Sequence, residues 1–101
     1  RIAVLGEMLE LGEESRSLHE QVGALVADAG VDTLIGLGAH SHYYLEGASG
    51  VANRTVASDP SDAARLVARF AEEGAVVLVK GSYGSQSWQV ADILREKGTT
   101  R

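Results

Sequence analysis

The sequence predicts an α/β fold in which a mostly parallel sheet lies between two layers of helices. Short apolar runs without alternation, typical of strands buried on both faces, alternate with segments whose apolar residues recur at helical spacing. The connections between them are short and often contain glycine, which favours parallel strands joined by right-handed crossovers. The expected order is β-α-β-α-β-α-β-α, a Rossmann-like, three-layer layout.

Four segments are expected to be strands. Residues 2–5 are an apolar run that ends at Gly6, and residues 33–37 form a second run of this kind. The strand at 54–57 is brief, whereas 75–79 has the strongest strand pattern in the chain. Ligands of such sheets bind beyond the carboxyl ends of the strands, so the loops that follow these segments are the expected site.

The first helix is expected between the first two strands. Ser17 and Glu20 form a possible capping box, and Gly30 stands where a helix-ending glycine belongs. His19 is expected to face solvent on this helix. The apolar positions that define the helix are Leu18, Val22, Leu25, Val26 and Ala29.

Three more helices follow. A short one is expected over 41–48, and a longer one begins with Asp59 as N-cap and Pro60 in the first turn and stops by Gly74. The last helix carries Val90, Ile93 and Leu94.

Composition limits the classes of protein. A chain of 101 residues with 45% hydrophobic residues can bury one core, which predicts one domain. No apolar run approaches the roughly 20 residues of a membrane span and no charged-then-apolar leader opens the chain, so a cytoplasmic protein is expected. The net charge of -5 argues against a nucleic-acid partner, and the absence of cysteine excludes disulfides and thiolate metal sites.

The loop after the first strand, GEMLELGEE at 6–14, holds four carboxylates, two of which are Glu7 and Glu10. Carboxylates in this place can bind a metal, a base or an ammonium group. Alternatively, Glu13 and Glu14 complement the positive end of the following helix, while Met8 and its apolar neighbours cover the sheet. Both interpretations stay open.

A second candidate is KGSYG at 80–84, a strand-to-helix junction. Glycine permits close backbone approach there, and helix N–H groups attract anions. The lysine precedes the glycines, so this is not the phosphate-binding Gly-x-x-x-x-Gly-Lys-Ser/Thr loop, and no nucleoside triphosphatase site of its own is visible. Glycines that only allow a tight turn remain the alternative.

Other chemistry-bearing residues give weaker signals. His40 and His42 lack a third ligand, so no metal site is expected. Trp88 and the pair Tyr43 and Tyr44 can stack on a ligand, although partial burial is the commoner fate of aromatic side chains. No nucleophile, base and orienting acid can be assembled, so no catalytic residue is assigned.

The segment IAVLGEMLELGEESRSLHEQVG at 2–23 closely resembles the C-terminal domain of the Mur ligases, in particular of the one that adds D-alanyl-D-alanine to the peptidoglycan precursor. The resemblance continues through VDTLIGLG, VVLVKGS and LREKGTTR and covers essentially the whole chain. It identifies residues 1–101 as this domain.

The resemblance implies an ATP-dependent carbon-nitrogen ligase of three domains, in which the first binds the UDP-sugar and the middle one holds ATP and Mg²⁺. In that family ATP phosphorylates the terminal carboxylate of UDP-N-acetylmuramoyl-tripeptide, and the amine of D-Ala-D-Ala attacks the acyl phosphate. The C-terminal domain closes as a lid and presents the dipeptide, and it is expected to be inactive alone.

The resemblance also implies which residues face the interdomain cleft. They come from the two loops described above: Glu7, Glu10, Gly12, Lys80, Gly81, Ser82 and Tyr83.

Two departures from the family pattern bear on specificity. Tyr83 stands where the family commonly has arginine, and Glu7 where it usually has aspartate. Arginine offers a planar set of donors to a carboxylate or phosphate, whereas tyrosine offers one hydroxyl. A ligase paralogue that accepts another amine is therefore one alternative, and a non-catalytic small-ligand or regulatory module is another.

The family's domain has a strand and a helix before the equivalent of Arg1, so the chain is expected to be truncated at its N-terminal edge. An unpaired sheet edge invites pairing between chains, which predicts weak self-association or marginal stability.

Overall fold

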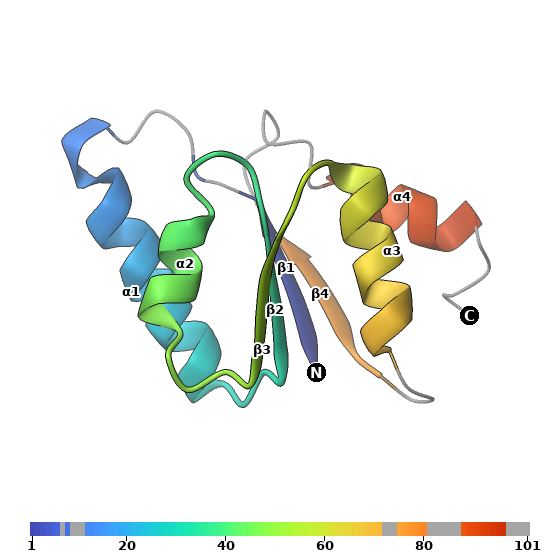
Figure 1. Cartoon of the computed structure of the whole chain (residues 1–101), viewed down its shortest axis with the longest axis horizontal. Helices are drawn as coiled ribbons and strands as arrows, with labels where there is room; N and C mark the ends of the chain where they lie inside the picture. The colour runs from blue at the N-terminus through green and yellow to red at the C-terminus, as the bar shows by residue number, and fades with distance from the viewer. Residues whose placement is uncertain (7, 9–11, 72–74, 81–87, 97–101) are drawn as a thin grey trace.

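Over the part of the chain that the structure describes, the sheet is parallel throughout (Figure 1). The computed structural model describes residues 1–6, 8, 12–71, 75–80 and 88–96. The strands within these residues are β1 (Ile2–Gly6), β2 (Thr33–Leu37), β3 (Asn53–Ala57) and β4 (Val77–Lys80). They lie side by side in the order β3-β2-β1-β4. The predicted α/β class is confirmed.

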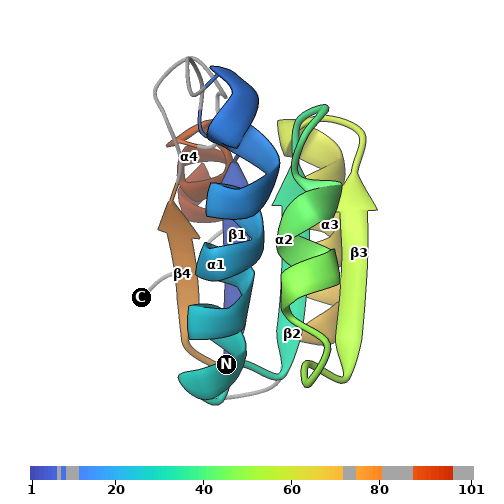
Figure 2. The ribbon, with the colours of Figure 1, turned by 90° about the vertical axis from the view of Figure 1, so that its left-hand side faces the viewer.

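Helices cover both faces of the sheet. A short 3₁₀ helix, η1 (Gly12–Glu14), leads into α1 (Ser15–Asp28), and α2 (His42–Gly47) lies beside α1 on the same face. The opposite face is covered by α3 (Pro60–Phe70) and α4 (Trp88–Glu96). Figure 2 looks onto the α1 and α2 side, with the sheet behind these helices.

The core forms on both sides of the central strands, because successive side chains of a strand point to opposite faces. In β1, Ala3 and Leu5 pack with the cluster under α1 and α2, whereas Ile2 and Val4 pack with the cluster under α3 and α4. All five residues of β1 and of β2 are buried. This double burial explains the continuous apolar runs of these strands.

Two predictions about α1 are wrong. The helix begins at Ser15 after Glu14, with no side-chain cap, and the Ser17 hydroxyl accepts a hydrogen bond from Gln21 in place of capping. His19 is fully buried, whereas Leu25 is 67% exposed. The inward face is the stripe of His19, Val22, Gly23 and Val26, whose i, i+3, i+4 and i+7 spacing matches one side of a helix.

The start of α3 is as predicted. Asp59 has extended backbone, and its side-chain Oδ1 accepts a hydrogen bond from the Asp62 N–H at 2.7 Å. Pro60 follows in the first turn, where its missing N–H costs nothing.

The strand β4 differs from its prediction in place and in strength. It has four residues, starts at Val77 and pairs with β1 at one edge of the described sheet. Val76 is 65% exposed and Leu78 is 52% exposed. The apolar run correctly indicates a strand, but a position at the sheet edge leaves alternate side chains uncovered.

Candidate functional site

The two predicted site loops start from neighbouring strands. β1 and β4 run parallel, and their register places Leu5 opposite Lys80. The carboxyl ends of both strands therefore lie at the same edge of the sheet, which is where ligands of such sheets bind. β2 ends beside them, with Leu37 opposite Gly6.

Two of the predicted site residues are described. Gly12 opens η1 with φ +61°, a backbone conformation that favours glycine, and it is exposed. Lys80 is exposed at the end of β4. The other predicted site residues lie outside the described residues: Glu7, Glu10, Gly81, Ser82 and Tyr83.

His19 holds the backbone just beyond β1. Its Nε2 atom lies 3.0 Å from the backbone nitrogen of Met8, and its Nδ1 atom lies 2.5 Å from the carbonyl oxygen of Ser15. A carbonyl can only accept and a backbone N–H can only donate, so Nδ1 carries the proton and Nε2 accepts. The ring is thus the neutral Nδ1–H tautomer, with both nitrogen atoms bonded.

Tyr44 of α2 holds the last residue of β1. Its hydroxyl donates a hydrogen bond to the Gly6 carbonyl oxygen at 2.8 Å, and the residue is 2% exposed. Its ring centroid lies 4.6 Å from that of His19. Side chains from two helices therefore anchor the main chain on both sides of position 7.

Sequence reasoning missed this pair. The sequence predicts His19 at the surface of the helix, and it indicates no more for Tyr44 than a stacking surface or a partly buried aromatic side chain. The available signal was the spacing of His19 from Val22, Gly23 and Val26, which places the imidazole on the buried stripe.

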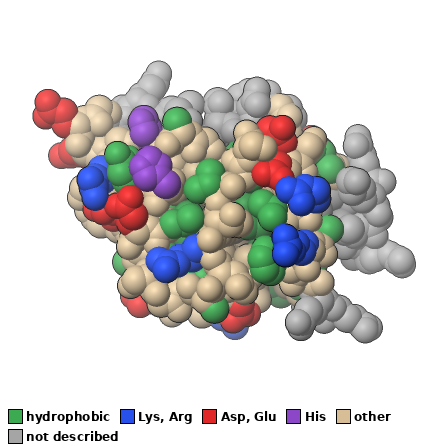
Figure 3. Space-filling model, viewed as in Figure 1, with side chains coloured by type: hydrophobic (Ala, Val, Ile, Leu, Met, Phe, Trp, Pro, Cys, Tyr) green, Lys and Arg blue, Asp and Glu red, His purple; other side chains and the backbone are tan. Residues whose placement is uncertain are grey.

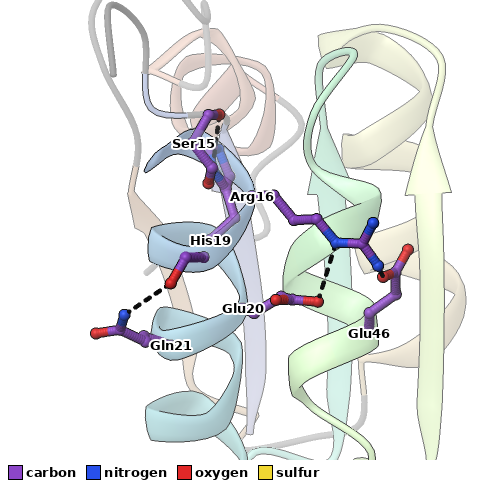
Figure 4. Close-up of polar contacts among 7 residues, drawn as sticks. Ser15, Arg16, His19, Glu20, Gln21 and Glu46 are labelled. Atoms are coloured by element: carbon purple, nitrogen blue, oxygen red, sulfur yellow. Dashed lines mark hydrogen bonds and ion pairs between the residues drawn. The ribbon is translucent and has the colours of Figure 1, made fainter. Parts of the chain in front are cut away.

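Charged and aromatic side chains gather on the outside of α1 and α2. Arg16 points from α1 toward α2, where its guanidinium lies 3.4 Å from a Glu20 carboxylate oxygen and 3.0 Å from one of Glu46 (Figure 4). The hydrogen bond to Glu20, together with the charge of Glu46, raises the pKa of Arg16 above its ordinary value. The same guanidinium lies 5.2 Å from the Tyr43 ring centroid. Arg16 thus already pairs with carboxylates of this chain.

Histidines lie next to this group on the surface (Figure 3). The His42 and Tyr43 ring centroids are 4.1 Å apart, and His42 Nδ1 lies 3.0 Å from the Ala39 carbonyl oxygen, to which it donates. Within the part of the chain that the structure describes, no three or more His, Cys, Asp or Glu side chains are grouped to hold a metal ion. His42 and Tyr43 thus contact each other, the backbone and, through Tyr43, the Arg16 guanidinium.

The helices of the described ranges are short. None of them is long and apolar enough to cross a membrane.

Comparison with known proteins assigns the family. A model of the family "Mur ligase, glutamate ligase domain" matches residues 1–83. The UDP-N-acetylmuramoyl-tripeptide--D-alanyl-D-alanine ligase of Escherichia coli (strain K12) is 38% identical over 100 residues, which are 98% of this chain and 22% of that protein. The protein of the same name from Mycobacterium leprae (strain TN) is 36% identical over 106 residues, 98% of this chain and 20% of that protein. The chain thus spans about a fifth of the length of these curated relatives.

Solved structures support the fold. The crystal structure of MurF ligase from Thermotoga maritima in complex with ADP matches 94% of this chain and 21% of its own, with a TM-score of 0.75 and 24% identity. MurF from Acinetobacter baumannii matches 94% of this chain and 22% of its own, with a TM-score of 0.78 and 22% identity. With the family match over residues 1–83, these findings show that the chain belongs to the Mur ligase family and contains its glutamate ligase domain.

Proposed function

We propose that residues 1–101 are the C-terminal lid and substrate-positioning domain of an ATP-dependent amide ligase that adds D-Ala-D-Ala to UDP-N-acetylmuramoyl-tripeptide. The relatives from Escherichia coli and Mycobacterium leprae are named for this reaction. The geometry that best supports a shared site is the pairing of β1 with β4, because it brings the bases of the two predicted loops together.

The proposed chemistry activates a poor acyl group and then positions an amine. ATP supplies the phosphoryl group that turns the tripeptide carboxylate into an acyl phosphate, and the dipeptide amine displaces phosphate to form the amide. Holding the amine in line with the acyl carbon lowers the entropic part of the barrier. A domain that closes over the reacting groups also excludes water, which would hydrolyse the acyl phosphate.

Lys80 has the chemistry for a role in this site. Its ammonium group is exposed at the carboxyl end of β4 and suits an anionic partner such as a phosphate or a carboxylate. The loop that begins with Gly6 leaves the adjacent strand and carries carboxylates in its sequence, which suit an ammonium group such as that of the dipeptide.

We propose that another domain of the intact enzyme binds most of ATP and Mg²⁺. The resemblance to the family supports this, because its middle domain holds the nucleotide, and Mg²⁺ is usually bound through substrate phosphates with one or two carboxylates. The relative from Thermotoga maritima was crystallised with ADP, which agrees with a nucleotide-dependent reaction. Because its substrates would be ATP and a UDP-linked precursor, we place the enzyme in the cytoplasm.

The test uses the intact enzyme that contains this chain. Purified protein is given ATP, Mg²⁺ and UDP-N-acetylmuramoyl-tripeptide with D-Ala-D-Ala, with D-alanine or with no amine, and phosphate release and product mass are measured. We expect phosphate release that depends on D-Ala-D-Ala, and a product that is heavier than the tripeptide precursor by two alanine residues. Release of phosphate no faster than in the reaction without amine would contradict the proposal.

Tyr83 bears on which amine the enzyme accepts, because it stands where the family commonly has arginine. If only another amine supports phosphate release, the protein is a ligase paralogue with a different acceptor.

Lys80→Ala is expected to lower kcat/KM for one of the substrates, whereas Arg69→Ala, which removes an exposed cation from the last turn of α3, is expected to leave it unchanged. Equal effects of both substitutions would argue against a specific role for Lys80.

A further inference from the structure

We infer that His19 and Tyr44 are positioning residues for the ligase reaction and hold the start of the loop after β1 in its working conformation. The inference rests on the proposed function, because it assigns that loop to the substrate site. Neither side chain is proposed to touch a substrate. Both act through the main chain on either side of Glu7.

The two anchors bind opposite polar groups of the backbone. Tyr44 donates to the carbonyl of Gly6 at 2.8 Å, and His19 accepts from the N–H of Met8 at 3.0 Å. Fixing a carbonyl and an N–H two residues apart restricts the rotation of the peptide groups between them. The main chain is therefore fixed at Gly6 and at Met8, the two described residues on either side of position 7 in the sequence.

The anchors are rigid because they are buried and in mutual contact. His19 is 0% exposed and Tyr44 is 2% exposed, and their ring centroids are 4.6 Å apart. They come from α1 and α2, which pack closely against each other, so the loop is tied to two helices at once. A site built on packed helices holds its groups more accurately than an unsupported loop does.

His19 does more than fill the space between the helices. A buried polar ring costs free energy unless it is hydrogen-bonded, and an apolar side chain in the same space would leave the Met8 N–H without this acceptor. Met8 lies beyond the last residue of β1, so its N–H has no partner in the strand ladder that pairs Ile2 to Gly6 with β2. The imidazole supplies the acceptor that the sheet does not.

Three variants of the intact enzyme test the inference. Tyr44→Phe removes only the hydroxyl. His19→Asn places its amide near the former Nδ1 position and cannot reach Met8, whereas the longer amide of His19→Gln reaches the former Nε2 position and can accept from Met8. Leu25→Ala on the exposed side of α1 is the control.

The expected result is a fall in kcat of about 10-fold for Tyr44→Phe and His19→Asn with KM for ATP unchanged, since misplacement of site groups slows the reaction without removing ATP contacts. His19→Gln should retain more activity than His19→Asn. Hydrogen exchange in a peptide that contains Met8 should be faster in His19→Asn than in wild type and close to wild type in His19→Gln. Assays are run well below the melting temperature of every variant.

Wild-type kcat in Tyr44→Phe and His19→Asn would overturn the inference, as would unchanged exchange at Met8 in His19→Asn. A loss of melting temperature with normal kcat would assign both residues a structural role only and would also overturn it. An inactive wild type would contradict the proposed function instead, and the exchange at Met8 would still decide whether His19 anchors the loop.

Discussion

The backbone of α1 at Gly23 lies directly against the carbonyl group of Tyr44 in α2. A Cβ atom at Gly23 would fall far inside van der Waals contact with that carbonyl, and one at Gly47 would do the same with the carbonyl of Glu20. The two helices therefore approach each other through paired glycines. This close approach brings Tyr44 within reach of the β1 end and of His19.

Gly23→Ala and Gly47→Ala are expected to destabilise the fold. Alanine has the higher helix propensity, by about 1 kcal/mol, but the clash with backbone atoms forces the helices apart and costs about 1–3 kcal/mol or more. Gly50→Ala is the matched control, because its Cβ would meet only the Ala27 Cβ at 4.0 Å. Thermal and urea denaturation measure the difference, and equal stability of Gly23→Ala and Gly50→Ala would contradict the packing.

Ile35→Ala is expected to lower the free energy of unfolding by about 2–5 kcal/mol, because it leaves a cavity in the core. Ile35 is fully buried in β2, a central strand of the sheet. Leu25→Ala removes a similar number of atoms from a side chain that is 67% exposed, and it should change stability by about 0.5 kcal/mol or less. Urea denaturation of both variants checks the contrast, and similar losses would show that the core assignment is wrong.

Asp59→Ala is expected to cost about 0.5–2 kcal/mol, because the N–H of Asp62 loses its side-chain acceptor at the start of α3. Ser61→Ala, at an exposed position of the same turn, serves as the control and should have little effect. Melting temperatures of the two variants provide the measurement. A stability of Asp59→Ala equal to that of Ser61→Ala would argue against the cap.

Asp62 makes the stability of the fold sensitive to acid. The backbone N–H of Ser58, followed in importance by the side chain of Arg65, lowers the pKa of Asp62 below its ordinary value. A carboxyl with a lower pKa in the folded state stabilises the fold above its unfolded pKa of about 3.9. That contribution is lost as the pH falls through the lower, folded pKa.

Asp62→Asn should remove this part of the acid dependence. The difference in unfolding free energy between wild type and variant is expected to be largest near neutral pH and to shrink below about pH 4. Urea denaturation from neutral to acidic pH gives the curve. A difference that stays constant with pH would show that the ionised form of Asp62 contributes nothing.

The exposed side of β4 predicts weak self-association of the 101-residue chain. Leu78 is 52% exposed on a strand at the edge of the described sheet, and such edges pair with other chains. Leu78→Lys should reduce the association, because a charge on an edge strand opposes pairing. Light scattering measures the mass, with Leu25→Lys as a control for an exposed leucine away from the edge. Unchanged association in Leu78→Lys together with a loss in Leu25→Lys would place the contact on α1.

Local patterns in the sequence were sufficient for most elements of the fold. The apolar runs of β1 and β2 reflect burial on both faces, and Asp59 with Pro60 marks the start of α3 through a cap that needs only neighbouring residues. Gly30 follows the end of α1 with φ +81°, as its place in the sequence predicted. The cap at Asp59 and the glycine at position 30 depend only on residues close in the chain, and the apolar runs show a preference for burial whatever covers them, so a sequence displays all three directly.

Tertiary structure alone decided the strand order, the inward face of α1 and the support of the candidate site. The position of β1 between β2 and β4 depends on strands far apart in the chain, as does the edge position of β4. Whether His19 is buried depends on α2 and on Met8, and no local pattern specifies its two hydrogen bonds. The resemblance indicated the loops that contain Glu7 and Lys80. That both loops start at the carboxyl ends of neighbouring strands follows only from the pairing of β1 with β4. The spacing of apolar residues along the chain indicates which residues tend to be buried. Which residues they contact is determined by packing between segments that are distant in the sequence.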